Sequence, residues 1–260
     1  MKKNQPLRFI QISDTHLRTR PNERLWGVDV DAGLAAVLAC IKQRHWPVDF
    51  MVATGDLVQD DGEAYARLRS VLEPLGVPVY CLPGNHDQPQ VLRECLSSGL
   101  VRWERQVING AWQFILLDST IPDSPGGHLA VSELVLLDQL LTANPDHYAV
   151  ICLHHHPVLI GSTWLDTMIS NGEDLFAVLD RHPRVRVVLW GHIHQAFSAR
   201  RREVQLLGVP STCVQFKPET ETAVADDLPP GYRWFELDDQ GTVATGVERI
   251  DWPFSNQLLA

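Results

Sequence analysis

The sequence predicts a layered α/β domain, and three observations lead to that prediction. Short apolar runs of β type alternate with longer stretches of helical periodicity, which is the order of βαβ units. At 260 residues the chain is long enough to bury one large core. No internal repeat, low-complexity tract or clear shift of composition marks a boundary, so we expect residues 1–260 to form a single domain.

The expected elements follow in order along the chain. Apolar, β-type runs predict strands at residues 7–13, 49–54, 77–82, 112–118, 148–153 and 185–190. Helical periodicity predicts helices at residues 30–43, 63–73, 90–97, 132–143 and 173–181. The last third is typical of antiparallel strands, expected at residues 203–209, 233–237 and 243–250. Asp239-Gln240-Gly241 supplies a turn between the final two strands.

Two segments, 18–29 and the acidic, proline-rich 217–231, are expected to be irregular loops. Loops of this length in a compact domain are often lids or binding loops.

Composition excludes several classes of protein. A formal net charge of −10 argues against a nucleic-acid partner, which requires a basic footprint. No apolar run is long enough to span a bilayer, and the polar start of the chain lacks the apolar core of a secretory signal. The five cysteines are odd in number and form no Cys-x-x-Cys pair, which favours buried free thiols in a reducing compartment. We therefore expect a cytoplasmic protein with no membrane partner.

Five short motifs occur where apolar stretches end. They are Asp14-Thr15-His16, Gly55-Asp56, Gly84-Asn85-His86-Asp87, His154-His155-His156 and Gly191-His192-Ile193-His194. Open α/β sheets place their ligands at the carboxyl ends of strands. In extended backbone, residues two apart share a face, so Asp14 with His16 and His192 with His194 can each supply two groups to one location. Carboxylates, an amide oxygen and imidazoles form the set that two bridged metal ions require.

Each motif alone also has an ordinary explanation. Asp-x-His and Gly-Asp are common in surface turns, and Asn or Asp before a helix is common at helix N-termini. Three histidines after a β-type run are harder to explain in this way, because alternation buries at least one of them. The occurrence of all five motifs in one order, each at a strand end, favours the metal site.

Other chemistries have less support. The chain has no Gly-x-Ser-x-Gly elbow, no P-loop and no Rossmann fingerprint. A cysteine nucleophile at Cys152, with His154 as its base, is conceivable, but the apolar neighbours of Cys152 favour a buried thiol.

The motifs resemble those of the calcineurin-like metallophosphoesterase superfamily, and the resemblance covers residues 7–194, the expected metal-ligand core of the domain. Residues 195–260 are expected to add further strands and loops to the same domain. Several stretches also resemble bacterial class III cyclic AMP phosphodiesterases. They are Gln11-Ile12-Ser13-Asp14-Thr15-His16-Leu17, Ala53-Thr54-Gly55-Asp56-Leu57, Leu82-Pro83-Gly84-Asn85-His86-Asp87, His154-His155-His156-Pro157, Trp164-Leu165-Asp166, the run from Pro210 to Pro218, and Gly231-Tyr232-Arg233-Trp234. The resemblance implies a four-layer αββα sandwich of two mixed β-sheets flanked by helices.

Carried over residue by residue, the resemblance implies two metal ions per chain, Fe or Mn by preference, with Zn an option. The first ion would be bound by Asp14, His16, Asp56 and His194, and the second by Asp56, Asn85, His154 and His192, so Asp56 bridges the pair. The family pattern selects His154 from the three histidines, whereas strand alternation equally allows His156 on that face.

The resemblance also implies hydrolysis of 3′,5′-cyclic AMP to 5′-AMP, by in-line attack of a metal-bound hydroxide on phosphorus. His86 would act as the general acid for the leaving ribose oxygen. Substrate contacts would come from His16, Asp56, Asn85, His86 and His194. One departure is Gln59, which stands where many members have the Asp that orients this histidine; Gln59 or the adjacent Asp60 is a candidate for that role.

Two other functions are weighed against this one. A related phosphoesterase acting on a glycerophosphodiester, a nucleotide pyrophosphate or a phosphomonoester would share the same motifs. A metal-dependent binding module without turnover would not need His86.

For several other residues the sequence allows both a functional and a structural role. His128 could reach a phosphate, although a loop histidine is usually exposed, and Arg200-Arg201-Arg202 could meet an anion or be a solvated turn. Trp164 and Phe216 could stack on adenine or pack in the core.

Overall fold

The computed structural model describes residues 5–165 and 168–251, and Asp166, from one of the stretches that carry the resemblance, lies outside them. The first of its two large sheets has six strands in the order β18-β17-β1-β4-β5-β6. Their bounds are β1 Leu7–Ile12, β4 Phe50–Thr54, β5 Val79–Leu82, β6 Val101–Trp103, β17 Gly231–Leu237 and β18 Val243–Arg249. Strands β1, β4, β5 and β6 are parallel, while β17 and β18 are antiparallel, as the sequence predicts.

The second sheet of the described chain also has six strands, in the order β13-β14-β12-β11-β8-β7. Their bounds are β7 Gln106–Asn109, β8 Trp112–Leu116, β11 Tyr148–Cys152, β12 Val185–Trp190, β13 Phe197–Arg201 and β14 Val204–Gly208. Strand β14 pairs in parallel with β12 and in antiparallel with β13. The antiparallel character expected for residues 203–209 is therefore correct for only one of the two edges of β14.

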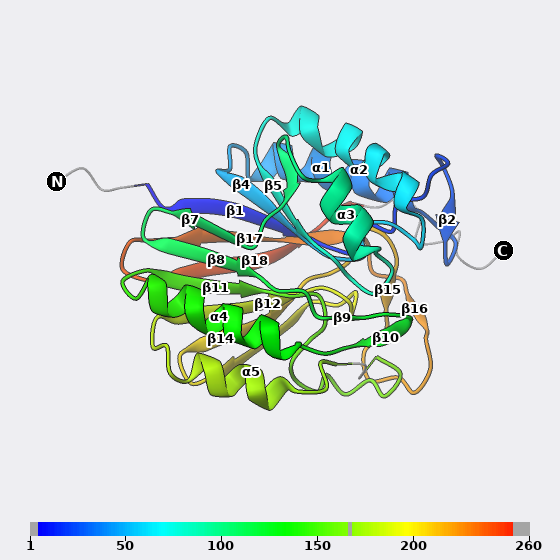
Figure 1. The fold of residues 1–260 in the computed structure, drawn as a ribbon. Helices are drawn as coiled ribbons and strands as arrows, with labels where there is room; N and C mark the ends of the chain where they lie inside the picture. The colour runs from blue at the N-terminus through cyan, green and yellow to red at the C-terminus, as the bar shows by residue number, and fades with distance from the viewer. Residues whose placement is uncertain (1–4, 166–167, 252–260) are drawn as a thin grey trace.

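Helices cover the outer face of each sheet, so the four-layer αββα arrangement is confirmed (Figure 1). Helices α1, α2 and α3 lie on the first sheet, and α4 and α5 lie on the second. Their bounds are α1 Val30–Arg44, α2 Tyr65–Leu72, α3 Pro89–Cys95, α4 Val131–Ala143 and α5 Gly172–Leu179. Short 3₁₀ turns at Gly62–Ala64 and Glu73–Leu75 flank α2, which accounts for the longer helix expected at 63–73.

Because side chains alternate along each strand, both faces of each sheet are buried: one packs against the helices and the other against the opposite sheet. In β4, Phe50 and Val52 face the other sheet, whereas Met51 and Ala53 pack beneath the helices. Phe9 lies at the centre of the layer between the sheets, with its ring centroid 4.3 Å from that of Phe235 and 5.1 Å from that of Phe114. This packing fixes the two sheets face to face and thereby sets the positions of the strand ends.

The two segments expected to be irregular contain short strands that the sequence did not predict. The segment 18–29 contains the hairpin of β2 Arg24–Leu25 and β3 Val28–Asp29, and the segment 217–231 contains β16 Ala225–Asp226, which pairs with β15 Gln215–Phe216 just before it. A third hairpin is formed by β9 Thr120–Ile121 and β10 Ser124–Gly127. Strands this short carry too little periodicity to be read from sequence.

None of the helices in the described part of the chain has the length and apolar content that crossing a bilayer requires. All five cysteines are free, and only Cys95 among them is exposed.

Candidate metal centre

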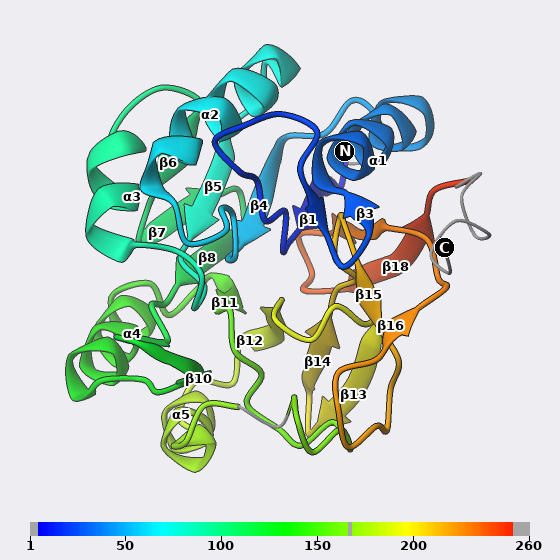
Figure 2. The same cartoon turned by 90° about the vertical axis from the view of Figure 1, so that its right-hand side faces the viewer.

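The candidate ligands gather at one edge of the sandwich, where the parallel strands of both sheets end. Asp14 and His16 follow β1, Asp56 follows β4, His154 follows β11 and His192 follows β12. Figure 2 shows β1 and β4 of one sheet beside β11 and β12 of the other. Backbone hydrogen bonds join the motifs directly: the Asp14 N–H donates to the Gly55 carbonyl at 3.0 Å, and the His16 N–H to the Asp56 carbonyl at 2.9 Å.

The first group of ligands consists of Asp14, His16 and His194, all buried, with donor atoms within 4.8 Å of one another. His16 Nε2 lies 3.2 Å from His194 Nε2, and His194 Nε2 lies 3.4 Å from Asp14 Oδ1. Asp56 Oδ2 completes this group, at 3.8 Å from His16 Nε2.

The second group forms around the other oxygen of the same carboxylate. Asp56 Oδ1 lies 3.4 Å from His154 Nε2, which in turn lies 3.2 Å from Asn85 Oδ1. The His192 ring packs 5.1 Å from that of His154, measured between centroids. The two oxygens of Asp56 therefore face two separate groups, which is the arrangement that a bridging carboxylate requires.

Hydrogen bonds turn the same ring nitrogen of three histidines toward the site. The Nδ1–H of His154 donates to the Thr54 carbonyl, that of His194 to the Val214 carbonyl and that of His16 to Gln59 Oε1, each at 2.8 Å. Because each acceptor is an oxygen, Nδ1 carries a proton and Nε2 points inward, where its lone pair can bind a metal once any proton on it is lost. Metal-ligating histidines are typically held in this way, so these side chains fit a metal pair.

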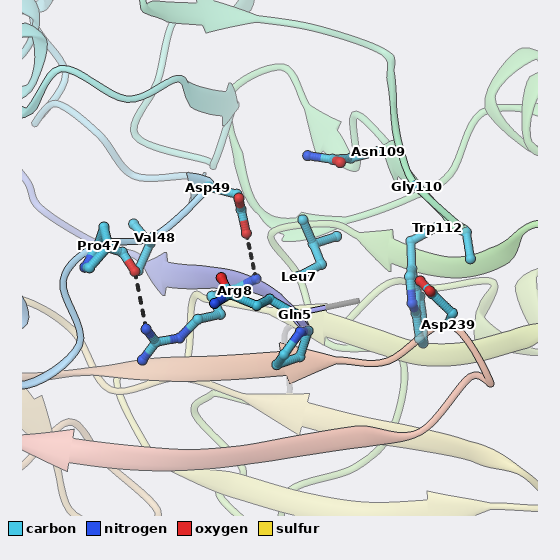
Figure 3. A pocket seen from close by; sticks show the side chains of 12 residues that line it. Gln5, Leu7, Arg8, Pro47, Val48, Asp49, Asn109, Gly110, Trp112 and Asp239 are labelled. Atoms are coloured by element: carbon cyan, nitrogen blue, oxygen red, sulfur yellow. Dashed lines mark hydrogen bonds between the residues drawn. The ribbon is translucent and has the colours of Figure 1, made fainter. Parts of the chain in front are cut away.

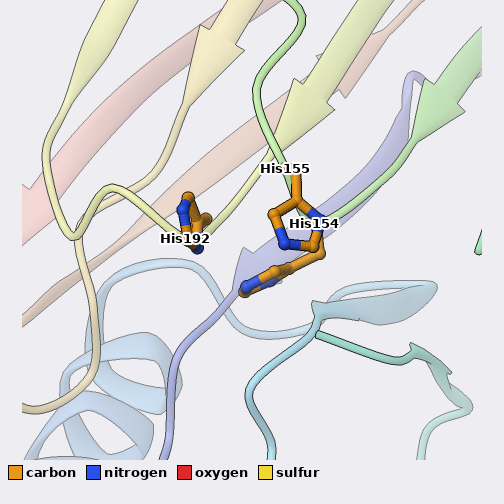
Figure 4. A group of neighbouring side chains, drawn as sticks. All are labelled: His154, His155 and His192. Carbon is orange, nitrogen blue, oxygen red and sulfur yellow. The ribbon is translucent and has the colours of Figure 1, made fainter. Parts of the chain in front are cut away.

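The three consecutive histidines occupy different surroundings. His154 and His155 both approach His192 (Figure 4), and the donor atoms of these three lie within 4.8 Å of one another. His155 Nδ1, however, lies 2.8 Å from the Ser119 hydroxyl, on the side of the second sheet. The His156 ring is stacked on that of His192 at a centroid distance of 5.8 Å. Of the three, only His154 forms an ion-pair contact with Asp56 in the described chain.

Burial and charge bring His16, His192 and Asp56 to the protonation states that metals bind, and His154 is the exception. Burial lowers the pKa of His16 to about 4, and burial together with the neighbouring histidines lowers the pKa of His192 well below its usual range. Burial alone would raise the pKa of Asp56, yet His154 and His16 hold it well below the usual range. Burial would lower the pKa of His154, but Asp56 raises it to about 9. A cation beside Asp56 would compete with this proton.

The backbone at the strand ends is strained. Asp14, His16, Asp56, His192 and His194 all have φ between 45° and 66°, a region that non-glycine residues rarely adopt. Such strain persists where the surrounding structure enforces it, and it clusters at functional sites.

His86 lies at the rim of this site, next to the candidate ligand Asn85. Its backbone N–H donates to Asp56 Oδ1 at 2.9 Å, and its ring lies 5.2 Å from that of His16. His86 Nδ1 is 2.9 Å from both Asp60 Oδ1 and Gln59 Nε2. Because Asp60 can only accept, a protonated His86 donates its Nδ1–H to Asp60 and leaves Nε2 for another partner.

A buried carboxylate to which the sequence assigned no role holds the loops around Asp56 and His86 together. Asp87 accepts hydrogen bonds from the Gly84 N–H at 2.8 Å, from the Leu57 N–H at 3.1 Å and from the Tyr65 hydroxyl at 2.8 Å. The final Asp of the Gly-Asn-His-Asp motif was the only available signal for this role.

The surroundings of Cys152, His128 and two of the three consecutive arginines argue against the other roles considered for them from the sequence. Cys152 is fully buried, and burial raises the pKa of its thiol, which removes it as a nucleophile. His128 is exposed and lies beside the Ser170 hydroxyl. Arg201 and Arg202 form ion pairs with Asp180 at the protein surface.

A cavity of about 360 Å³ lies at the other end of the strands, away from the candidate ligands (Figure 3). Its wall is formed by residues near the starts of β1, β4 and β8. In this wall the Arg8 backbone N–H donates a hydrogen bond to the Asp49 carboxylate. Its described lining contains neither histidine nor cysteine, so it offers no comparable set of metal ligands.

The fold and the two joined ligand groups define a class, the hydrolases with a dinuclear metal site. The chain belongs to the calcineurin-like phosphoesterase family, whose model matches residues 7–196. The resemblance drawn from the motifs is thereby confirmed.

Curated relatives extend over most of the chain. It is 38% identical to the 3′,5′-cyclic adenosine monophosphate phosphodiesterase CpdA of Pseudomonas aeruginosa, covering 94% of this chain and 90% of that protein. It is 37% identical to the 3′,5′-cyclic-nucleotide phosphodiesterase alr5338 of Nostoc sp., covering 97% of this chain and 96% of that protein. A dimetal phosphatase from Danio rerio shares the fold, with a TM-score of 0.61 at 14% identity over 95% of this chain and 100% of that one.

Proposed function

We propose that this protein hydrolyses 3′,5′-cyclic AMP to 5′-AMP at the site formed around Asp56. The observation that carries the proposal is the position of the Asp56 carboxylate, whose two oxygens face two groups of metal ligands. The substrate follows from the relatives, two of which are named as cyclic-nucleotide phosphodiesterases and match the chain almost end to end.

In this proposal Asp14, His16, Asp56 and His194 would hold one ion, and Asp56, Asn85, His154 and His192 the other. When bound, such a pair supplies an activated water and neutralises charge on the phosphate. The mixed nitrogen and oxygen ligands suit Fe or Mn, with Zn also compatible. His16, Asp56, Asn85, His86 and His194 line the same cavity, so they are the side chains that would surround the phosphate.

His86 is assigned the general acid. A water that has lost one proton to solvent bonds to phosphorus as the P–O3′ bond breaks, and His86 Nε2–H protonates the departing 3′ oxygen. 5′-AMP forms, and His86 regains its proton from solvent. Asp60 stabilises the cationic imidazole by accepting its Nδ1–H, in the place that Gln59 leaves unfilled. Gln59 Oε1 accepts from His16, and only the Gln59 amide nitrogen, which cannot accept a proton, approaches His86 Nδ1.

The chain acts in this proposal as one domain in the cytoplasm. Both sheets contribute side chains to a single site, which argues for one structural unit. Five free thiols, of which four are buried, suit a reducing compartment.

The test combines metal analysis with turnover. Purified protein is assayed for Fe, Mn and Zn by mass spectrometry, and for cyclic AMP hydrolysis before and after chelation, with 5′-AMP identified by chromatography. Two equivalents of metal with chelator-sensitive formation of 5′-AMP support the proposal. Hydrolysis of glycerophosphodiesters or phosphomonoesters without turnover of cyclic AMP would replace the substrate, and binding without any turnover would refute the enzymatic role.

A further inference from the structure

A cavity of about 330 Å³ opens beside the ligand groups and is lined by two kinds of side chain. One part of the lining is polar and consists of His16, Asp56, Gln59, Asn85, His86, His192 and His194. The other part is apolar and consists of Leu25, Trp26, Pro125, Trp164, Leu165 and Phe216. The metal-site chemistry accounts for the first part only.

Three aromatic rings of the apolar part form a connected group that begins at a candidate ligand. The Phe216 ring lies 4.8 Å from that of His194, so it is one ring removed from the first ligand group. The indoles of Trp164 and Trp26 stand nearly perpendicular to Phe216, at 85° and 87°, with centroid distances of 4.8 Å and 5.7 Å. A group attached to a bound phosphate therefore meets aromatic faces next.

Trp26 occupies a position that local structure does not favour. It forms, with Gly27, the two-residue turn between β2 and β3, where both residues have positive φ, 50° and 81°. Such turns strongly prefer Asn-Gly. Trp26 is also 52% exposed, which is unusual for so large an apolar residue. Neither turn formation nor core packing accounts for tryptophan here, whereas its place in the cavity wall does.

Trp164 and Phe216 are held in place by the segment that follows β15. Phe216 lies in β15, paired with Ala225 of β16, and is only 8% exposed. The Trp164 indole N–H donates to the Thr220 hydroxyl at 3.0 Å, in the loop between these two strands. Segments distant in sequence thus fix two of the rings, and the β2–β3 turn brings the third.

The charge of the lining indicates how a ligand would be recognised. The described residues of the apolar part carry no charged side chain, so an ion pair there is excluded as the means of recognition. Flat aromatic faces bind other π systems by stacking, and such contacts accept any nucleobase. A glycerol group has no π face and would gain little from three aromatic rings.

We propose that Trp26, Trp164 and Phe216 form a nucleobase subsite, which selects cyclic nucleotides over phosphodiesters that lack a base. This inference rests on the proposed function, since it places the phosphate of the substrate at the ligand groups. The adenine of cyclic AMP stacks on the rings while the ribose spans the distance between base and phosphate.

The test compares two substrates that differ only in the base: cyclic AMP and 1-deoxyribose 3′,5′-cyclic phosphate, the same cyclic ester without adenine. The variant is Trp26→Asn, because asparagine suits the turn and the hairpin is retained. We expect the ratio of kcat/KM for cyclic AMP to that for the base-free ester to fall about tenfold, within the range measured for loss of one stacked base. Phe216→Leu should lower the same ratio.

The matched control is Ile108→Asn, which replaces an apolar side chain of similar exposure, 49%, on β7. This variant should keep the wild-type ratio. An unchanged ratio in Trp26→Asn would overturn the subsite. If both substrates lose activity equally, the indole has a structural role, and if neither does, it has no role in selecting the base.

A second readout separates this inference from the proposed function. Adenosine carries the base and no phosphate, so it should compete with bis(p-nitrophenyl) phosphate in the wild type and compete about tenfold more weakly in Trp26→Asn. If the wild type hydrolyses bis(p-nitrophenyl) phosphate but not cyclic AMP, the proposed substrate is wrong, and the adenosine assay still decides the subsite. Equal inhibition of both proteins by adenosine would overturn the subsite alone.

Discussion

The general acid assigned to His86 makes the loss of activity depend on the leaving group. An alkoxide such as the ribose 3′ oxygen needs a proton as it departs, whereas p-nitrophenolate leaves readily without one. Positioned acid catalysis contributes about 10² to 10⁴ in rate. His86→Ala should therefore lower kcat for cyclic AMP by about that factor, with a much smaller loss for bis(p-nitrophenyl) phosphate.

The structure also sets the size of the effect expected at Asp60. Its side chain is 66% exposed and that of His86 is 36% exposed, so solvent screens the 2.9 Å ion pair. Exposed pairs contribute about 0.2–1 kcal/mol. On cyclic AMP that range corresponds to a loss of about 1.4- to fivefold in Asp60→Asn.

The assay is steady-state kinetics of wild type, His86→Ala and Asp60→Asn on both substrates, with metal content measured for each protein. Equal losses on the two substrates in His86→Ala, with metal retained, would remove the general-acid role. A loss in Asp60→Asn as large as that in His86→Ala would show that the pair is far stronger than its exposure implies.

Three further predictions concern the metal site and the thiols. A Cβ at Gly84 would collide with Asp56 Oδ1, so Gly84→Ala should lower bound metal to below half of wild type. The control is Gly126→Ala, where a Cβ has no atom nearer than 3.6 Å, and this variant should keep its metal. Elemental analysis of both proteins measures the difference. Because Asp56 raises the pKa of His154 to about 9, this histidine is protonated in the metal-free protein at pH 7.5 and must lose that proton to bind an ion. Loading with Mn²⁺ should then release about one proton per chain, with affinity falling as the pH is lowered, and a pH-indicator titration without proton release would contradict this. In native protein a thiol reagent should label Cys95 rapidly and the four buried cysteines only after unfolding, and rapid labelling of a second thiol would show that the core opens.

Much of the fold was accessible from sequence because long apolar elements carry a clear period. The strand expected at 185–190 matches β12, Val185–Trp190, and the helix expected at 30–43 matches α1, Val30–Arg44, to within one residue. The short strands β2, β3, β15 and β16 were not predicted, because two residues show no alternation and pairing with a partner decides their conformation.

The sequence by itself determined the chemistry of the site. The five motifs carry the carboxylates, the amide and the imidazoles, and their place at strand ends indicated that they would meet at one edge of the sheets. The motifs can be identified from sequence although they lie far apart along the chain, because each motif is local and each follows a recognisable strand.

Only the tertiary structure decided how these groups are oriented and what surrounds them. Alternation left His154 and His156 equivalent, and it is the contact with Asp56, which follows β4 of the other sheet, that distinguishes His154. Asp60 rather than Gln59 faces His86 as an acceptor, and Trp26 reaches Phe216 across nearly the whole chain. Such contacts depend on how two sheets and three hairpins pack in space, and no local pattern in a sequence records the distance between residues that are far apart along it.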